Sequence, residues 1–101
     1  MILYNVTVKI TTDAHQEWVH WMKNTHIPDV LATGLFTGYK MFRIMGDEDP
    51  EGVTYAIQYF SPSLDAFLRY RDEHSPRLQA EHAQRYANKY VAFRTLMEEI
   101  L

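Results

Sequence analysis

Four segments of this chain have the residue patterns of strands, and no other feature of the sequence constrains the fold as strongly. Apolar and polar residues alternate in residues 1–10 and 53–60, whereas residues 35–45 and 90–97 are rich in apolar and aromatic residues. In the first segment, Tyr4, Val6, Val8 and Ile10 fall on one face of a strand, and the residues between them fall on the other. Apolar residues at helical spacing follow the first segment and, again, the third. The predicted strands cover residues 1–10, 35–45, 53–60 and 90–97.

The order of these segments is β-α-β-β-α-β, with a hairpin in the middle. Residues 46–52 join the two central strands and have the glycine, aspartate and proline content of a turn. Chains of this order form a split βαβ unit, in which an antiparallel four-stranded sheet carries both helices on one face. We therefore predict one ferredoxin-like α+β domain over residues 1–101.

Each predicted helix is interrupted once by a proline. The first begins after a cap at Thr12 or Asp13 and meets His26-Ile27-Pro28, and the second runs from residue 63 to about 88 and meets His74-Ser75-Pro76. The residue before a proline avoids the α region, so we expect each helix to break there and to restart on its proline. Ser75 is expected to be the N-cap of the helical segment that follows the second break.

The predicted sheet is rich in apolar and aromatic residues on both faces. Only one face can be covered by the two helices, so a monomer would expose a large apolar patch. Aromatic residues make up 14% of the chain, which is more than one thin core easily absorbs. We therefore predict a homodimer in which the second copy packs sheet to sheet against the first.

Several classes of protein do not fit this sequence. The chain has no cysteine, so disulfides, thiolate metal sites and a cysteine nucleophile are excluded. Its formal net charge of −3 opposes nucleic-acid binding, and no apolar run approaches the roughly 18 residues of a membrane span. The spacing of the five histidines predicts no metal site. Since nothing resembles a signal peptide, we expect a cytoplasmic protein with neither nucleic acid nor membrane as partner.

The stretches 18–22, 26–34, 53–60 and 91–97 resemble the bacterial domain-of-unknown-function family 4286, and the resemblance covers nearly the whole chain. That family is similar to the dimeric α/β-barrel group, in which two ferredoxin-like protomers join their sheets and keep the helices outside. The resemblance implies this fold and a dimer. It implies no reaction, because the family has no assigned activity.

The wider group includes cofactor-free monooxygenases, haem-degrading monooxygenases and small isomerases. In the haem-degrading type, an asparagine on the first strand and a histidine on the second helix serve the haem, near a tryptophan. Asn5 and His74 match the first two by position, whereas Phe67 and Tyr70 stand in the region of the tryptophan. This departure argues against haem chemistry, and we predict no bound cofactor.

Two histidines are candidate catalytic residues. His26 lies at the helix break beside the Trp18/Met22 stripe, where it could act as a general acid or base in a pocket. It could equally satisfy free carbonyls at a helix C-terminus. His74 follows Asp72-Glu73, whose carboxylates could orient its ring, although acids in a charged helix are also ordinary surface residues.

Further residues are assigned from their helix or strand face. Stripes that we expect to face the sheet are Trp18, Trp21 and Met22 in the first helix and Ala80, Ala83 and Ala87 in the second. The predicted ligand-binding residues are Trp18, Met22, His26, Tyr55, Tyr59 and His74.

The leading hypothesis is a dimer that binds a small apolar or aromatic molecule between helices and sheet. A monooxygenase- or isomerase-type enzyme with a pocket histidine, and an interaction module without a pocket, remain alternatives.

Overall fold

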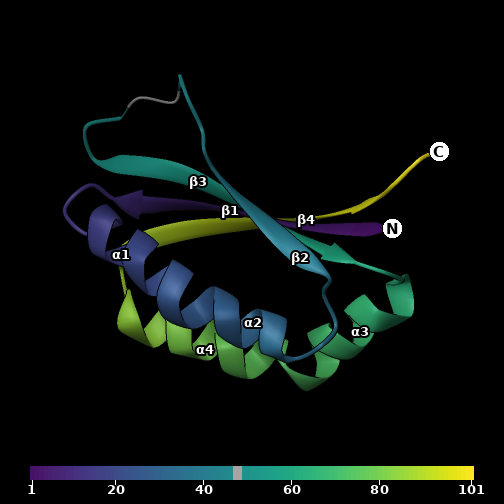
Figure 1. Ribbon diagram of the computed structural model, residues 1–101. Coiled ribbons are helices and arrows are strands. Elements are labelled where there is room, and N and C mark those ends of the chain that lie inside the picture. Colours follow the sequence, from purple (N-terminus) through teal and green to yellow (C-terminus); the bar gives the residue numbers. More distant parts are fainter. Residues whose placement is uncertain (47–48) are drawn as a thin grey trace.

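The computed structural model describes residues 1–46 and 49–101 and has the expected order of elements (Figure 1). The turn predicted at 46–52 includes residues 47 and 48, which lie outside the described residues. The strands are β1 (Ile2–Thr11), β2 (Gly38–Arg43), β3 (Gly52–Ser61) and β4 (Tyr90–Glu98). The helices are α1 (His15–Trp21), the π-helical segment η1 (Met22–His26), α2 (Ile27–Ala32), α3 (Leu64–Glu73) and α4 (Ser75–Arg85).

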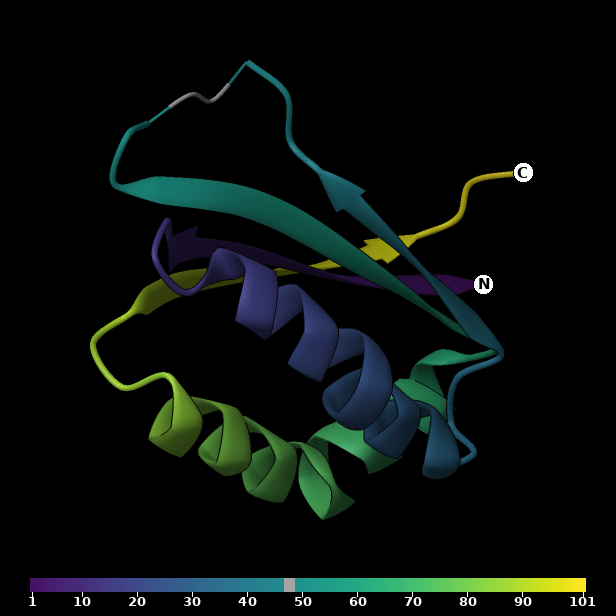
Figure 2. The same ribbon diagram turned by 60° about the vertical axis from the view of Figure 1, so that its left-hand side comes forward.

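The four strands form one antiparallel sheet in the order β2-β3-β1-β4. All the helices lie on one face of this sheet, as two views 60° apart agree (Figures 1 and 2). This arrangement confirms the predicted ferredoxin-like α+β fold. The edge strands β2 and β4 leave a backbone edge on either side, and β4 follows the end of α4 directly.

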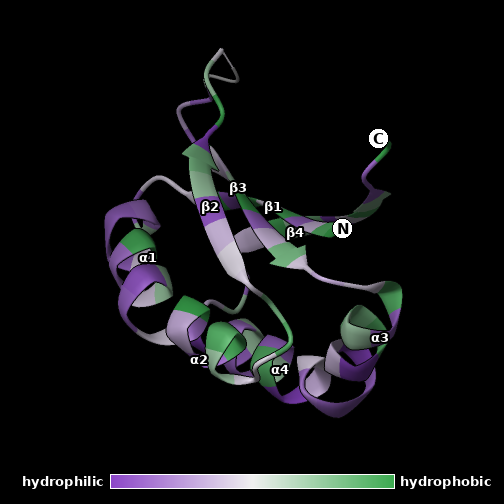
Figure 3. Cartoon of the chain, turned by 45° about the vertical axis from the view of Figure 1, so that its right-hand side comes forward, coloured by the Kyte–Doolittle hydropathy of each residue, from purple (hydrophilic) through white to green (hydrophobic). Residues whose placement is uncertain are grey.

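Figure 3 shows residues of different hydropathy following one another along the strands. Because successive side chains of a strand point to opposite faces, this order decides which of them meet the helices. On β1 the even-numbered residues face them, and Tyr4, Val8 and Ile10 are buried there. On β3 the odd-numbered residues face them, with Ile57 and Tyr59 almost completely buried. Burial of each such side chain stabilises the fold by about 1.5–3 kcal/mol, so this face holds the core.

The first helical region does not break at Pro28, which corrects the sequence-based prediction. The chain stays helical from α1 through η1 into α2, and the N–H of Ile27 bonds to the carbonyl of Met22, five residues back. A proline inside an α-helix lacks an N–H and collides with the carbonyl four residues earlier. The wider π turn accommodates the proline without ending the helix.

The second helical region does break, as predicted, at His74. Its backbone lies outside the helical region (φ −126°, ψ −38°), so α3 ends at Glu73 and α4 begins at Ser75. Ser75 is not the cap that we predicted. It is the first residue of α4, and its hydroxyl accepts a hydrogen bond of 2.6 Å from the Gln79 amide.

The buried face of α4 also differs from the prediction. Ala80, Ala83 and Ala87 are exposed, whereas Leu78, His82 and Tyr86 are buried. These larger residues also repeat at helical spacing but bury far more apolar surface than the alanines could, so they set the orientation of the helix. His82, which belongs to this buried set, therefore faces the sheet.

Candidate functional site

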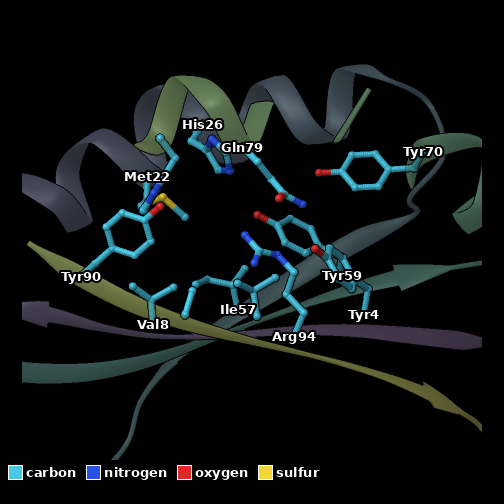
Figure 4. A pocket seen from close by; sticks show the side chains of 13 residues that line it. Tyr4, Val8, Met22, His26, Ile57, Tyr59, Tyr70, Gln79, Tyr90 and Arg94 are labelled. Atoms are coloured by element: carbon cyan, nitrogen blue, oxygen red, sulfur yellow. The ribbon is translucent and has the colours of Figure 1, made fainter. Parts of the chain in front are cut away.

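A cavity of about 40 Å³ lies between the sheet and the helices, on the side covered by η1 and α4 (Figure 4). Its wall combines aromatic rings with a few polar groups. The lining residues are Tyr4, Val6, Val8, Met22, His26, Ile57, Tyr59, Tyr70, Gln79, His82, Tyr90, Ala92 and Arg94.

Strand register places Arg94 on the cavity side. Arg94 pairs with Val6 in β1, and Val6 pairs with Ile57 in β3, so all three side chains point toward the helices. In Figure 4 the Arg94 guanidinium rises from β4 toward the helix layer, with His26 and Gln79 above it. Because β4 is an edge strand, the Arg94 side chain remains exposed although it reaches the cavity.

His82 is held by a tryptophan behind the cavity. The indole Nε1 of Trp18 donates a hydrogen bond of 2.9 Å to Nε2 of His82. An indole N–H can only donate, so Nε2 must be unprotonated and the neutral His82 ring carries its proton on Nδ1. Burial, followed by the influence of His26 and Arg94, lowers the pKa of His82 to about 4. At neutral pH this ring is therefore uncharged and has a fixed tautomer.

His26 has no comparable anchor. Its Nδ1 is buried and has no hydrogen-bond partner within residues 1–46 and 49–101. Burial, opposed by the negative charge of Asp29 and assisted by the positive charge of Arg94, lowers the pKa of His26 to about 4. Its ring lies 5.8 Å from His82 and 5.3 Å from Trp21, measured between ring centroids. A neutral imidazole with a free buried nitrogen can accept or donate one hydrogen bond to a ligand.

Arg94 supplies the positive charge of the site. None of the ion pairs formed by the described residues includes its guanidinium. Burial raises the pKa of Tyr4, and the charge and hydrogen bonding of Arg94 counteract part of that rise. Burial raises the pKa of Tyr70 strongly, so both phenols stay protonated and offer O–H groups rather than charge.

A second hollow of about 190 Å³ adjoins the cavity next to β4 and is called the outer cleft below. Tyr4, Tyr70, Gln79 and Arg94 line both hollows, so these four side chains separate the cavity from the cleft. The cleft is otherwise lined by Phe67, Arg71, Ser75, Thr95 and Leu96. The outer cleft therefore lies beside the cavity at the edge of the sheet, between β4 and the α3–α4 junction.

The structure brings together some of the predicted site residues. Met22, His26 and Tyr59 line the cavity. Trp18 does not line it and acts through its hydrogen bond to His82. Tyr55 lies elsewhere, with its hydroxyl 2.9 Å from Nδ1 of His15.

His74 also lies away from the cavity. It is the residue between α3 and α4, and its Nδ1 is 3.5 Å from Nη2 of Arg77. His26 is not a helix C-terminal residue, because the chain stays helical on both sides of it. Catalytic roles for either histidine stay predictions.

Ten of the thirteen lining residues were not among the predicted site residues, and three of these ten, His82, Gln79 and Arg94, carry the polar groups discussed here. The sequence carries a signal for His82, because Leu78, His82 and Tyr86 repeat at helical spacing beside the alanine stripe. Arg94 is a charged residue in the middle of a mostly apolar strand segment. Gln79 carries no such signal.

Haem does not fit these residues. Asn5 lies on the sheet face opposite the helices, where its amide donates to the Thr7 hydroxyl at 3.0 Å. His74, the second residue that the resemblance would assign to haem, does not line the cavity. A cavity of about 40 Å³ is also far smaller than the roughly 300–1,000 Å³ of pockets for drug-sized ligands.

No group of three or more His, Cys, Asp or Glu side chains among the described residues could hold a metal ion. In that same part of the chain, no helix is both long and apolar enough to cross a membrane.

The fold is shared with several solved structures of low sequence identity. A MhuD variant with two manganese protoporphyrin IX molecules bound per active site matches with a TM-score of 0.72 and 18% identity, over 100% of this chain and 96% of that one. A dimeric ferredoxin-like protein from an uncultured marine organism matches with a TM-score of 0.70 and 5% identity, over 100% and 99%. A variant of SnoaB, a cofactor-independent oxygenase from Streptomyces nogalater, matches with a TM-score of 0.64 and 14% identity, over 97% and 92%.

At these identities the likeness shows the fold alone. A search of curated proteins found no match to the sequence. A family model does match, and it covers residues 1–100. The chain therefore belongs to the domain-of-unknown-function family DUF4286, as its sequence resemblance indicated.

Proposed function

We propose that this protein is a homodimer that binds a small organic molecule at the cavity between helices and sheet. One observation carries the proposal: an aromatic wall surrounds Nδ1 of His26, which has no hydrogen-bond partner among the described residues, and the Arg94 guanidinium, which forms no ion pair among them. Binding sites for small molecules combine an apolar lining with a few such convergent polar groups. An interaction module without a pocket is correspondingly less favoured.

Small aromatic probes test the binding proposal. Phenol, benzamide and benzoate are titrated into the protein while NMR follows the ring C–H signals of His26 and His82. We expect saturable shifts of these two histidines and none of the exposed His20. If none of the three probes shifts either ring at millimolar concentration, the cavity is not a binding site.

A cavity-filling substitution serves as the matched test. Ala92 lines the cavity on β4, so Ala92→Phe should abolish the shifts by occupying the space. Ala83→Phe makes the same change at an exposed position of α4 and should leave the shifts unchanged. Thermal melting of both variants establishes that each is folded.

The proposed dimer rests on the sheet face that the helices leave open. Phe93 is 69% exposed and Val91 55% exposed on β4, and Phe42 is 48% exposed on β2, all on this face. Exposed apolar side chains at both edges of this face favour an interface, because large exposed apolar patches mark interaction sites. The dimeric ferredoxin-like protein with the same fold is consistent with a second copy as the partner. Light scattering that gave a monomer at micromolar concentration would contradict the dimer.

A second candidate function is a proton-transferring enzyme of the monooxygenase or isomerase kind. The buried, unpartnered Nδ1 of His26 favours it, since a neutral imidazole beside a guanidinium can take a proton from a substrate whose anion the guanidinium stabilises. Deuterium exchange of the acidic C–H groups of acetylacetone in D₂O tests this activity. Catalysed exchange that disappears in His26→Gln supports it, and exchange no faster than in buffer excludes it for this probe.

A further inference from the structure

We propose that the ligand is a small organic acid with one carboxylate, whose charged head enters the cavity at Arg94 while its apolar body occupies the outer cleft. This inference rests on the proposed binding function and adds the chemical class of the ligand. It depends on three features of the site, namely the sizes of the two hollows, the charges along their walls and the hydrogen-bonding groups that remain free.

The sizes of the hollows divide the ligand into two parts. The cavity of about 40 Å³ has room for a head group of only a few atoms, because one water already needs at least about 10–15 Å³ of such space. The outer cleft of about 190 Å³ is several times larger, and the apolar side chains of Phe67 and Leu96 line part of it. A ligand that enters from the cleft therefore places a small polar head inside and a larger apolar body outside.

The charges select an anionic head. The described residues that line the cavity and the cleft include no aspartate or glutamate, and the two cavity histidines are neutral at pH 7. The charge of Asp29 raises the pKa of His26, but Asp29 is not among the residues that line the cavity. Arg71 in the cleft is already paired with Asp72 at 2.9 Å. Arg94 is thus left as the uncompensated positive charge where the two hollows meet.

The free hydrogen-bonding groups favour a carboxylate over a larger anion. A guanidinium presents a planar fork that matches a carboxylate with two parallel hydrogen bonds. Nε2 of His82 is already occupied by Trp18, so the remaining donor of this ring is Nδ1–H. A doubly charged phosphate would need more positive charge than one arginine and more space than the cavity provides.

The test compares benzoate with benzamide, its neutral counterpart of nearly equal shape, by titration calorimetry and by NMR of the histidine rings. We expect benzoate to bind about tenfold more tightly or better, which is the size of a charge-assisted hydrogen bond. Arg94→Gln should remove this preference, whereas Arg94→Lys should keep part of it. Arg43→Gln removes an exposed arginine from the opposite edge strand and should have no effect on the preference.

The other possible results separate the carboxylate proposal from the binding proposal. If benzamide binds as tightly as benzoate, or if Arg94→Gln keeps the preference, the carboxylate proposal is wrong while the binding proposal stands. If inorganic phosphate shifts the histidine signals more strongly than benzoate, the site selects phosphate instead. If neither benzoate nor benzamide nor phenol binds, both proposals fail together.

Discussion

The indole of Trp18 in α1 donates a hydrogen bond of 2.9 Å to the His82 ring in α4 and so joins the two helical regions directly behind the cavity. Trp18 is completely buried and His82 nearly so. The bond therefore has two consequences: it stabilises the packing of α1 against α4, and it decides which nitrogen of His82 holds the proton.

Trp18→Phe is expected to lower the free energy of unfolding by about 2 kcal/mol or more, because Nε2 of His82 loses its donor while it stays buried. Urea unfolding measures this change. Nitrogen-15 NMR should also show that the fixed Nδ1–H tautomer of His82 becomes a mixture. Trp21→Phe, at a partly buried position, is the control and should preserve the tautomer.

Stability should fall as the pH drops from about 6.5 to 4. His26 and His82 have ordinary pKa values near 6.5 in the unfolded chain and values of about 4 in the folded one. Below pH 6.5 the unfolded chain therefore binds protons that the folded chain does not, which favours unfolding. We expect each histidine to cost between about 1 and 2 kcal/mol at pH 5 relative to pH 7.5.

Urea unfolding at several pH values checks this dependence. His26→Gln should flatten the curve between pH 7.5 and 5, because glutamine does not titrate. His20→Gln, which alters an exposed histidine, should leave the curve as it is. An identical slope in the wild-type protein and in His26→Gln would show that His26 is not buried in its neutral form.

The open face of the sheet gives a prediction about assembly. Phe93→Glu places a charge at the most exposed aromatic position of this face and should convert the proposed dimer to a monomer at micromolar concentration. Leu64→Glu introduces the same charge at a 49% exposed residue of α3, away from the sheet, and should remain dimeric. Sedimentation velocity distinguishes the two. A dimer that survives Phe93→Glu and dissociates with Leu64→Glu would place the interface on the helices.

The fold was predictable from sequence because strand patterns and helical spacing are local signals, and they mark the segments in the order that the structure shows. The site was only partly predictable. His26 stood out through its neighbouring proline, but His82 was hidden because two stripes, one of alanines and one of larger residues, fit the same helix. Arg94 became part of the site through strand register and the tilt of α4, which depend on contacts between distant segments.

The π turn was the feature that local rules described least well, and it leads to a last prediction. Pro28 was expected to end the helix, yet the chain stays helical through η1 into α2, and Met22 and His26 lie at the cavity wall.

Pro28→Ala restores an N–H and removes the ring that collides with the preceding turn, so an ordinary α-helix becomes possible. Because this change shifts the residues before position 28 around the helix axis, His26 should leave the cavity. We expect the helix content and stability to be kept or increased while the response of His26 to benzoate is lost. Ala32→Gly, at the last residue of α2, weakens the helix without touching the π turn and should keep the response. A Pro28→Ala protein whose His26 still responds to benzoate would show that the packing of α1 and α2, and not the proline, holds the π turn in place.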